Sequence, residues 1–270
     1  MRRDAAGEAA SEERVSGARR PQTLANSIAW DSGLAYAEDR GPWDDPGRPD
    51  DAAPARVYAR DSVVFGRAYG EWSAAWHQWA DSMPAKKHPL FDTAPCSEGQ
   101  SGPVWFLGGR FCVPEVNPDC VNVPAVRECT VPAGKALYFP VLNISCLDAE
   151  AKNNLCGTAG PFITEMRAFV TGAIDETTDL AVTLDGKPLK VNLKRDFRVQ
   201  SPVYTSIMPE GNLLQALGET VIGAGTYFGV DDGVYVMLKP LHKGDHTLNF
   251  KGRFPQFDFS LDFTYKLIVK

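Results

Sequence analysis

The strongest apolar pattern in the chain lies between residues 62 and 82. Its large aromatic residues are four, three, four and three positions apart, which places them on one face of an α-helix. They are Phe65, Tyr69, Trp72, Trp76 and Trp79. Asp61 or Ser62 can cap the start of this helix, and Pro84 follows its end. The pattern therefore predicts a long helix over residues 62–82 with one aromatic face.

From residue 102 onward, short apolar runs alternate with glycine- and proline-containing turns, which is typical of β-strands. These runs cover residues 104–107, 135–142, 180–184, 188–193, 198–207, 234–238 and 247–250. Asp185-Gly186 is a hairpin signal, and Asp231-Asp232-Gly233 indicates a turn before a further strand. Residues 259–269 alternate between apolar and polar positions, which predicts a closing strand with one buried face. Helices are expected over residues 161–174 and 212–217.

These elements predict a mostly β protein, either a β-sandwich or a jelly-roll-like fold. One Trp-rich helix and a second, shorter helix are expected to pack on this β structure, and three disulfides are expected to cross-link it. We expect a single domain over residues 57–270. Residues 1–56 are rich in charged residues, alanine, glycine and proline and have no apolar periodicity. That composition predicts a disordered or loosely docked leader.

Composition and charge exclude several classes of partner. The 270 residues are 44% hydrophobic and 23% charged, with a net charge of −6 and no dense basic stripe. We therefore expect no nucleic-acid partner. No apolar run of about 18 residues is present, so we expect no transmembrane segment. The first residues lack the apolar stretch of a signal peptide, which predicts that a signal is removed or missing.

All six cysteines fall within residues 96–156. Structural zinc takes closely spaced cysteine pairs, whereas seven residues separate the two nearest cysteines here. The set therefore indicates three disulfides and a secreted, periplasmic or cell-surface location. Six cysteines permit fifteen pairings. The preferred one is Cys96–Cys129, Cys112–Cys120 and Cys146–Cys156. The last two pairs close short loops, and the first spans the loop that carries the second.

Five stretches of the chain stand out together. They are YGEWSAAWHQW (69–79), GQSGPVWFL (99–107), CTVPAGKAL (129–137), DGVY (232–235) and KPLHKGDHTL (239–248). The chain resembles, through these stretches, an uncharacterised family of secreted bacterial proteins, over most of its length from Tyr69 on. The resemblance implies export and a shared architecture, and it brings no assigned activity or catalytic residues. This chain departs from the family pattern at His77, where an aromatic residue is expected, and in the extra pair Cys112–Cys120.

The Trp-rich helix has a functional and a structural interpretation. Trp72 and Trp76, together with Trp105, can form an aromatic platform for a sugar ring or another apolar ligand. The structural interpretation is that the stripe is the helix face that packs into the core, which is the common reason for such spacing. Glu71 and His77 are candidate catalytic residues. They lie six positions apart and point to different sides of the helix, so that helix alone does not bring them together.

Other chemical signals are weaker. Asp231, Asp232 and Asp245 could supply oxygen ligands to calcium, but no D-x-D-x-D-G loop is present. His242 and His246 are four apart, but the turn between them argues against a shared helix face. The nucleophile elbow, the phosphate loop and the H-E-x-x-H motif are missing. We therefore expect no metal and no cofactor.

Three functions are compatible with this pattern. The leading hypothesis is a secreted or cell-surface binding module for an extracellular small molecule or polysaccharide, without catalysis of its own. One alternative is a secreted hydrolase of an extracellular polymer with Glu71 and His77 in a cleft. The other is a structural envelope protein.

Overall fold

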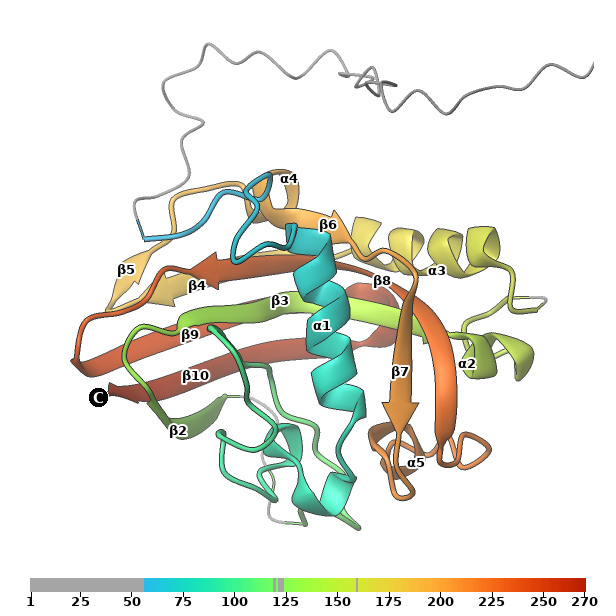
Figure 1. Ribbon diagram of the computed structural model, residues 1–270. Helices are drawn as coiled ribbons and strands as arrows, with labels where there is room; N and C mark the ends of the chain where they lie inside the picture. The colour runs from blue at the N-terminus through green and yellow to red at the C-terminus, as the bar shows by residue number, and fades with distance from the viewer. Residues whose placement is uncertain (1–55, 119, 121–123, 159) are drawn as a thin grey trace, which may run out of the picture. The chain divides into compact units, whose positions relative to one another are not determined.

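A computed structural model describes residues 56–118, 120, 124–158 and 160–270. The expected leader therefore lies outside the described residues, except for Arg56. The described residues form two five-stranded sheets with helices packed around them (Figure 1). The mostly β class predicted from the strand pattern is confirmed, and the architecture is a two-sheet sandwich.

The first sheet is built on two long antiparallel strands, β3 (Ala136–Leu147) and β8 (Gly225–Leu238). The short strand β1 (Val104–Phe106) runs parallel to the beginning of β3. On the far edge of β8 lie β6 (Arg198–Gln200) and β7 (Tyr204–Met208). A bulge between Pro140 and Leu142 interrupts the pairing of β3 with β8. In the rest of β3, this bulge changes which backbone groups point away from β8.

The second sheet has the strand order β2-β10-β9-β4-β5. These strands are β2 (Ala125–Val131), β10 (Phe259–Val269), β9 (Gly244–Phe254), β4 (Thr178–Leu184) and β5 (Lys187–Pro188). The alternation predicted for the closing strand is confirmed, because every second residue of the C-terminal half of β10 is buried. The two sheets face each other through aromatic rings such as those of Phe139 and Phe250, whose centroids are 5.0 Å apart.

Helices cover both faces of the first sheet. Helix α1 (Tyr69–Asp81) crosses its outer face in front of β3 and β8, while α3 (Ile163–Asp175) contacts β3 and β8 (Figure 1). Shorter helices are α2 (Asp148–Lys152), α4 (Leu193–Phe197) and α5 (Leu213–Ala216). Single 3-10 turns are η1 (Ala85–Lys87), η2 (Pro89–Phe91) and η3 (Pro255–Phe257). The helices expected over residues 161–174 and 212–217 are confirmed.

The predicted start of the Trp-rich helix is wrong by seven residues, since α1 begins at Tyr69. A tight turn precedes it, in which Val64 and Arg67 exchange backbone hydrogen bonds. Phe65 and Gly66 adopt positive φ angles of 50° and 80° in this turn, a region that helices do not use. Phe65 is therefore 47% exposed and does not belong to the buried aromatic face.

Three predictions for the β region are also wrong. The strand expected over residues 188–193 is limited to Pro188 at the end of β5, because Asn192 caps α4, which begins at Leu193. Asp231-Asp232-Gly233 is not a turn but lies in the middle of β8, where both carboxylates are fully buried. Buried polar groups are tolerated when other side chains satisfy them, and both aspartates have such partners. The strand expected over residues 198–207 is divided into β6 and β7. Pro202, which lies between them, lacks the N–H needed to continue the ladder.

The three disulfides are Cys96–Cys129, Cys112–Cys120 and Cys146–Cys156, which is the pairing expected from the loop lengths. The first ties the segment after α1 to β2. The third ties the end of β3 to the loop after α2. In the described residues, no helix is long and apolar enough to cross a membrane.

Candidate functional site

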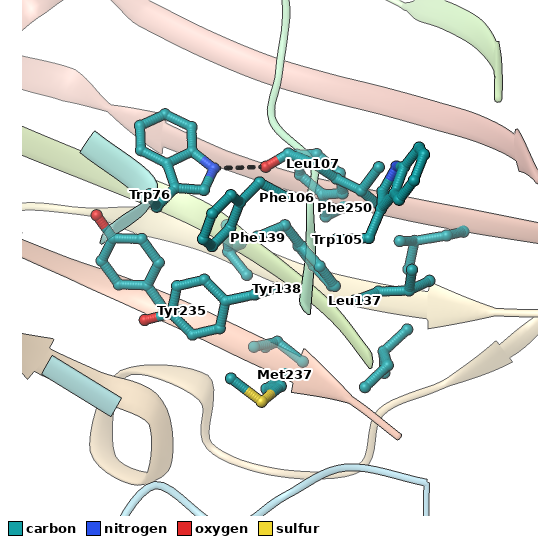
Figure 2. Packing of buried hydrophobic residues seen from close by; sticks show 14 of the residues in the cluster. Trp76, Trp105, Phe106, Leu107, Leu137, Tyr138, Phe139, Tyr235, Met237 and Phe250 are labelled. Carbon is teal, nitrogen blue, oxygen red and sulfur yellow. Dashed lines mark hydrogen bonds between the residues drawn. The ribbon is translucent and has the colours of Figure 1, made fainter. Parts of the chain in front are cut away.

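The aromatic stripe of α1 is packed into the core, and Figure 2 shows Trp76 of this stripe with its indole N–H directed at the Leu107 carbonyl. Trp72, Trp76 and Trp105 are only 6%, 5% and 6% exposed. The indole N–H of Trp72 donates to the Val64 carbonyl, and that of Trp76 donates to the Leu107 carbonyl at 2.7 Å. These rings therefore leave no open face on which a sugar could stack, and the aromatic stripe is the core face of the helix.

A second stripe on α1 is polar and equally buried. Ser73, His77 and Asp81 follow one another at intervals of four residues and are 0%, 5% and 6% exposed. They face the first sheet, where α1 contacts β7 and β8. Of these three residues, the sequence pattern pointed only to His77. The signal for Ser73 and Asp81 is their spacing of four residues on either side of His77, next to the more conspicuous tryptophans.

His77 meets Asp231 beneath the helix. Its Nε2 atom lies 3.3 Å from Oδ2 of Asp231, which also accepts a 2.5 Å hydrogen bond from the Tyr235 hydroxyl. Burial alone lowers the pKa of His77, but the hydrogen bond and negative charge of Asp231 raise it above its usual value. The raised pKa favours an imidazolium that balances the buried carboxylate. Oδ1 of Asp231 is buried, and no described residue donates a hydrogen bond to it.

Further polar groups continue this arrangement, which we call the buried polar layer (Ser73, His77, Asp81, Asn143, Glu150, Tyr204, Ser206, Asp231 and Tyr235). Asn143 and Glu150 are half-buried at its border, and the other members are buried. The Ser206 hydroxyl donates to Asp81 at 2.5 Å, and the Tyr204 ring stacks on His77 at 5.4 Å. Burial raises the pKa of Asp81, and it raises the pKa of Glu150 to about 7. The layer therefore holds one carboxyl group, that of Glu150, whose pKa lies near neutral pH.

Asn143 connects the buried polar layer to a pocket beside β3. Its Nδ2 atom lies 3.1 Å from Nε2 of His77 and donates to the Tyr235 hydroxyl at 3.0 Å. The same residue lines a pocket of about 100 Å³, to which Arg110 is the other polar contributor. The apolar walls include Trp76, Leu90, Phe111, Leu142, Phe254 and Leu261. A mostly apolar pocket with a few polar groups is typical of a small-ligand site.

The loop that forms one wall of the pocket is held by buried hydrogen bonds. The Tyr265 hydroxyl donates to the Gly108 carbonyl at 2.7 Å and accepts from Arg127 at 2.6 Å. Burial lowers the pKa of Arg127, but Tyr265 and Asp92 together raise it above its usual value. Asp92 also pairs with Arg110, which brings that guanidinium to the pocket. Hydrogen bonds and ion pairs thus fix the position of the loop at residues 108–111, which borders the pocket.

Exposed aromatic side chains lie next to Phe254, which lines the pocket. The turn between β9 and β10 brings the Phe257 and Phe259 rings to 5.8 and 6.3 Å from the Phe254 ring. Phe257 is 49% exposed and Phe259 is 37% exposed, although Phe259 also lines the pocket. Exposed apolar groups that gather beside a pocket are typical of binding surfaces.

The candidate catalytic pair Glu71 and His77 is not brought together. Glu71 is exposed and accepts a 2.8 Å hydrogen bond from the Ala68 N–H, so it caps the start of α1. His77 is buried about 1.7 turns further along the same helix, on a different side. The structure thus assigns Glu71 a local role at the helix terminus.

The candidate calcium ligands are separated as well. Asp231 and Asp232 are consecutive in β8 and point to opposite faces, so Asp231 meets His77 and Asp232 pairs with Arg198 at 2.8 Å. Asp245 is exposed at the start of β9. Among the described residues, no group of three or more histidine, cysteine, aspartate or glutamate side chains is arranged to hold a metal ion.

Comparison with known proteins adds little. No family model matches the chain, and no curated protein matches its sequence. Among solved structures, a similar chain is the cysteine protease inhibitor EhICP2 from Entamoeba histolytica, at 9% identity. The match covers 54% of this chain and 87% of that chain, with a TM-score of 0.19. A similarity of this size carries no argument about fold or function.

Proposed function

We propose that this protein is an extracellular binding module without catalysis of its own. One observation supports the proposal above the others: a mostly apolar pocket of about 100 Å³ lies beside β3 and is lined by residues of both sheets, with exposed aromatic rings next to its lining residue Phe254. Three disulfides support an oxidising location, such as the cell surface or periplasm.

The pocket favours a compact apolar group over a sugar. Each hydroxyl of a bound sugar needs a hydrogen-bond partner, and Arg110 and Asn143 are the only side chains with strongly polar groups in the lining. The burial of Trp72 and Trp76 also removes the stacking surface that a polysaccharide would use. We therefore narrow the expected ligand from a polysaccharide to one that inserts a branched aliphatic or small aromatic group.

Fluorobenzene observed by fluorine NMR tests the pocket directly. We expect saturable line broadening with the native protein and its loss in Leu261→Phe, because the larger side chain fills the pocket from its wall. Ile268→Phe is the matched control, since Ile268 is exposed on the same strand. Unsaturable broadening with the native protein, or equal broadening with Leu261→Phe, contradicts the proposal.

The two alternative functions are a hydrolase and a structural envelope protein, and each predicts a different experimental result. A panel of polysaccharide and ester substrates, with Glu71→Gln as the comparison, tests for hydrolysis. Turnover that depends on Glu71 or His77 would support the enzyme and contradict the binding module. Absence of both turnover and fluorobenzene binding would support the structural envelope protein.

A further inference from the structure

One edge of the first sheet has no partner strand along most of β3. The parallel strand β1 pairs only with residues 136–138, whereas β3 continues to Leu147. In the described part of the chain, no strand pairs with this edge beyond Tyr138. Asn143, Ile144 and Ser145 are partly exposed there, although most of β3 is buried. Unpaired edges are the places where sheets accept additional strands.

The directions of hydrogen bonds show which backbone groups face this edge. The Tyr138 carbonyl accepts from the Leu107 N–H at 3.0 Å, so Tyr138 faces outward, and alternate residues follow the same phase. The bulge between Pro140 and Leu142 inserts one residue and shifts that phase. Beyond the bulge, the outward residues are therefore Asn143 and Ser145.

The pairing of β3 with β8 shows independently that the backbone groups of Ser145 point to the open edge. Ser145 lies opposite Asp231, whose carbonyl accepts from the Ser201 N–H at 3.1 Å on the far side of β8. Residues directly opposite each other in an antiparallel pair either exchange both hydrogen bonds or neither. Because Asp231 turns its backbone groups away from β3, Ser145 turns its own groups away from β8 and towards the edge.

Both ends of this edge are closed, and its middle is open. Leu147 has the outward phase, and its N–H donates to the Glu150 carboxylate at 2.7 Å. Pro140, which faces outward before the bulge, has no N–H. Within the described residues, no hydrogen bond satisfies the backbone N–H or C=O of Asn143 or Ser145. The edge thus offers a window of two residues with all four backbone groups available.

The pocket lies along the same edge. Four consecutive residues of β3, 140–143, line it. The Asn143 side chain points to the α1 face of the sheet, where it meets His77, whereas Leu142 lies against Gly252 of the second sheet. A cavity that touches both residues must reach the edge of the strand. The pocket therefore occupies the position beside β3 that β1 would take if that strand continued beyond Phe106.

We propose that an extended peptide from another protein adds to this edge as a strand and places one apolar side chain in the pocket. The inference rests on the proposed binding function and names its class of ligand. An extended polypeptide matches the repeat of N–H and C=O groups on a strand edge, and the pocket supplies a preference for one side chain. Leucine, valine or phenylalanine suits the apolar walls.

Capped peptides of sequence KTXTXTK, with X as valine, leucine or phenylalanine, test this inference by amide NMR of the native protein. We expect at least one peptide to bind saturably and to shift the amide signals of Asn143 and Ser145. N-methylation of alternate peptide bonds on the pairing side should abolish the shifts. In the free protein, these two amides should exchange with solvent faster than the amide of Ile144, which pairs with β8.

A proline substitution tests the edge from the protein side. Ser145→Pro removes the outward N–H, and Ser145→Ala removes only the hydroxyl. We expect Ser145→Pro to bind the peptide at least about fivefold more weakly than Ser145→Ala, as for the loss of one hydrogen bond. Retained fluorobenzene binding shows that Ser145→Pro is folded.

Three results would overturn the inference. The first is slow exchange of the Asn143 and Ser145 amides in the free protein. The second is failure of all three peptides while fluorobenzene still binds, which leaves the pocket proposal intact. The third is a concentration-dependent dimer in sedimentation that peptides do not dissociate, which would assign the edge to a second copy of this chain. Failure of fluorobenzene as well would overturn the proposed function.

Discussion

Nε2 of His77 lies 3.3 Å from Oδ2 of Asp231, and both side chains are buried between α1 and β8. The contact joins the first helix to one of the last strands. The raised pKa of His77 favours an imidazolium next to the Asp231 carboxylate, which would otherwise be an isolated buried charge and therefore costly. Helix α1 contributes Trp76 to the pocket wall. The His77–Asp231 contact, which holds α1 against β8, therefore also affects the shape of the pocket.

Removal of either member of the pair should destabilise the protein. We expect His77→Ala and Asp231→Asn each to lower the free energy of unfolding by about 3 to 5 kcal/mol, because the remaining charge stays buried without its partner. Urea unfolding measures the loss. The double variant should lose less than the sum of the two single variants. Strict additivity would contradict the pairing, and Gln78→Ala, at the exposed neighbouring position, is the control.

The contribution of His77 should depend on pH in a defined direction. Its pKa is raised in the folded protein, so the folded state binds a proton more tightly than the unfolded state. The stabilisation is complete below the unfolded pKa of about 6.5 and is lost as pH rises through the folded pKa. The loss of unfolding free energy in His77→Ala should therefore be larger at pH 5.5 than at pH 9. These pH values lie roughly one unit below and more than two units above the unfolded pKa of histidine. An equal cost at both would argue against an imidazolium.

Glu150 should also make stability fall as pH rises. Its pKa is raised from 4.5 to about 7, because burial disfavours the carboxylate. Between these values the folded state keeps a proton that the unfolded state has lost, so stability decreases with increasing pH. Glu150→Gln keeps a neutral side chain, and its stability relative to the native protein should increase across this pH range. A constant difference in urea unfolding would contradict the raised pKa.

The Tyr265 hydroxyl should stabilise the loop beside the pocket. Tyr265→Phe leaves Gly108 and Arg127 without a shared hydrogen-bond partner, and we expect a loss of about 1 to 3 kcal/mol. Tyr227→Phe is the control, because its hydroxyl donates to one carbonyl in a partly buried setting and its loss should cost less. Fluorobenzene affinity should fall with Tyr265→Phe alone. Unchanged stability and affinity would show that the loop is held by other contacts.

The disulfides should differ in their contribution to stability according to loop length. Replacing Cys96 and Cys129 by alanine should cost about 3.7 kcal/mol, and replacing Cys146 and Cys156 about 2.7 kcal/mol, from the entropy of the loops they close. Intact mass under non-reducing conditions should be lower than that of the reduced chain by six hydrogen atoms, two for each bond. Six free thiols in exported material would contradict the oxidised state.

Local patterns were sufficient for much of the fold. The closing strand β10, the Asp185-Gly186 turn, the helix α3 and the pairs Cys112–Cys120 and Cys146–Cys156 all follow from periodicity or short loops, which depend on neighbouring residues. The start of α1 was missed because the aromatic spacing continues to Phe65, while the chain reverses at Gly66. The long strand β8 was missed because two aspartates and a glycine resemble a turn until their partners are known.

The sequence by itself determined the class of fold, the apolar face of α1 and the oxidised cysteines, because each depends on the order of residues along one element. Only the tertiary structure decided the site. Asp231 becomes a partner of His77, and Asn143 a link to the pocket, through contacts between distant segments. The open edge at Asn143 and Ser145 depends on where β1 ends and where β3 bulges. Neither is encoded in local periodicity, because strand pairing is a long-range property of the chain.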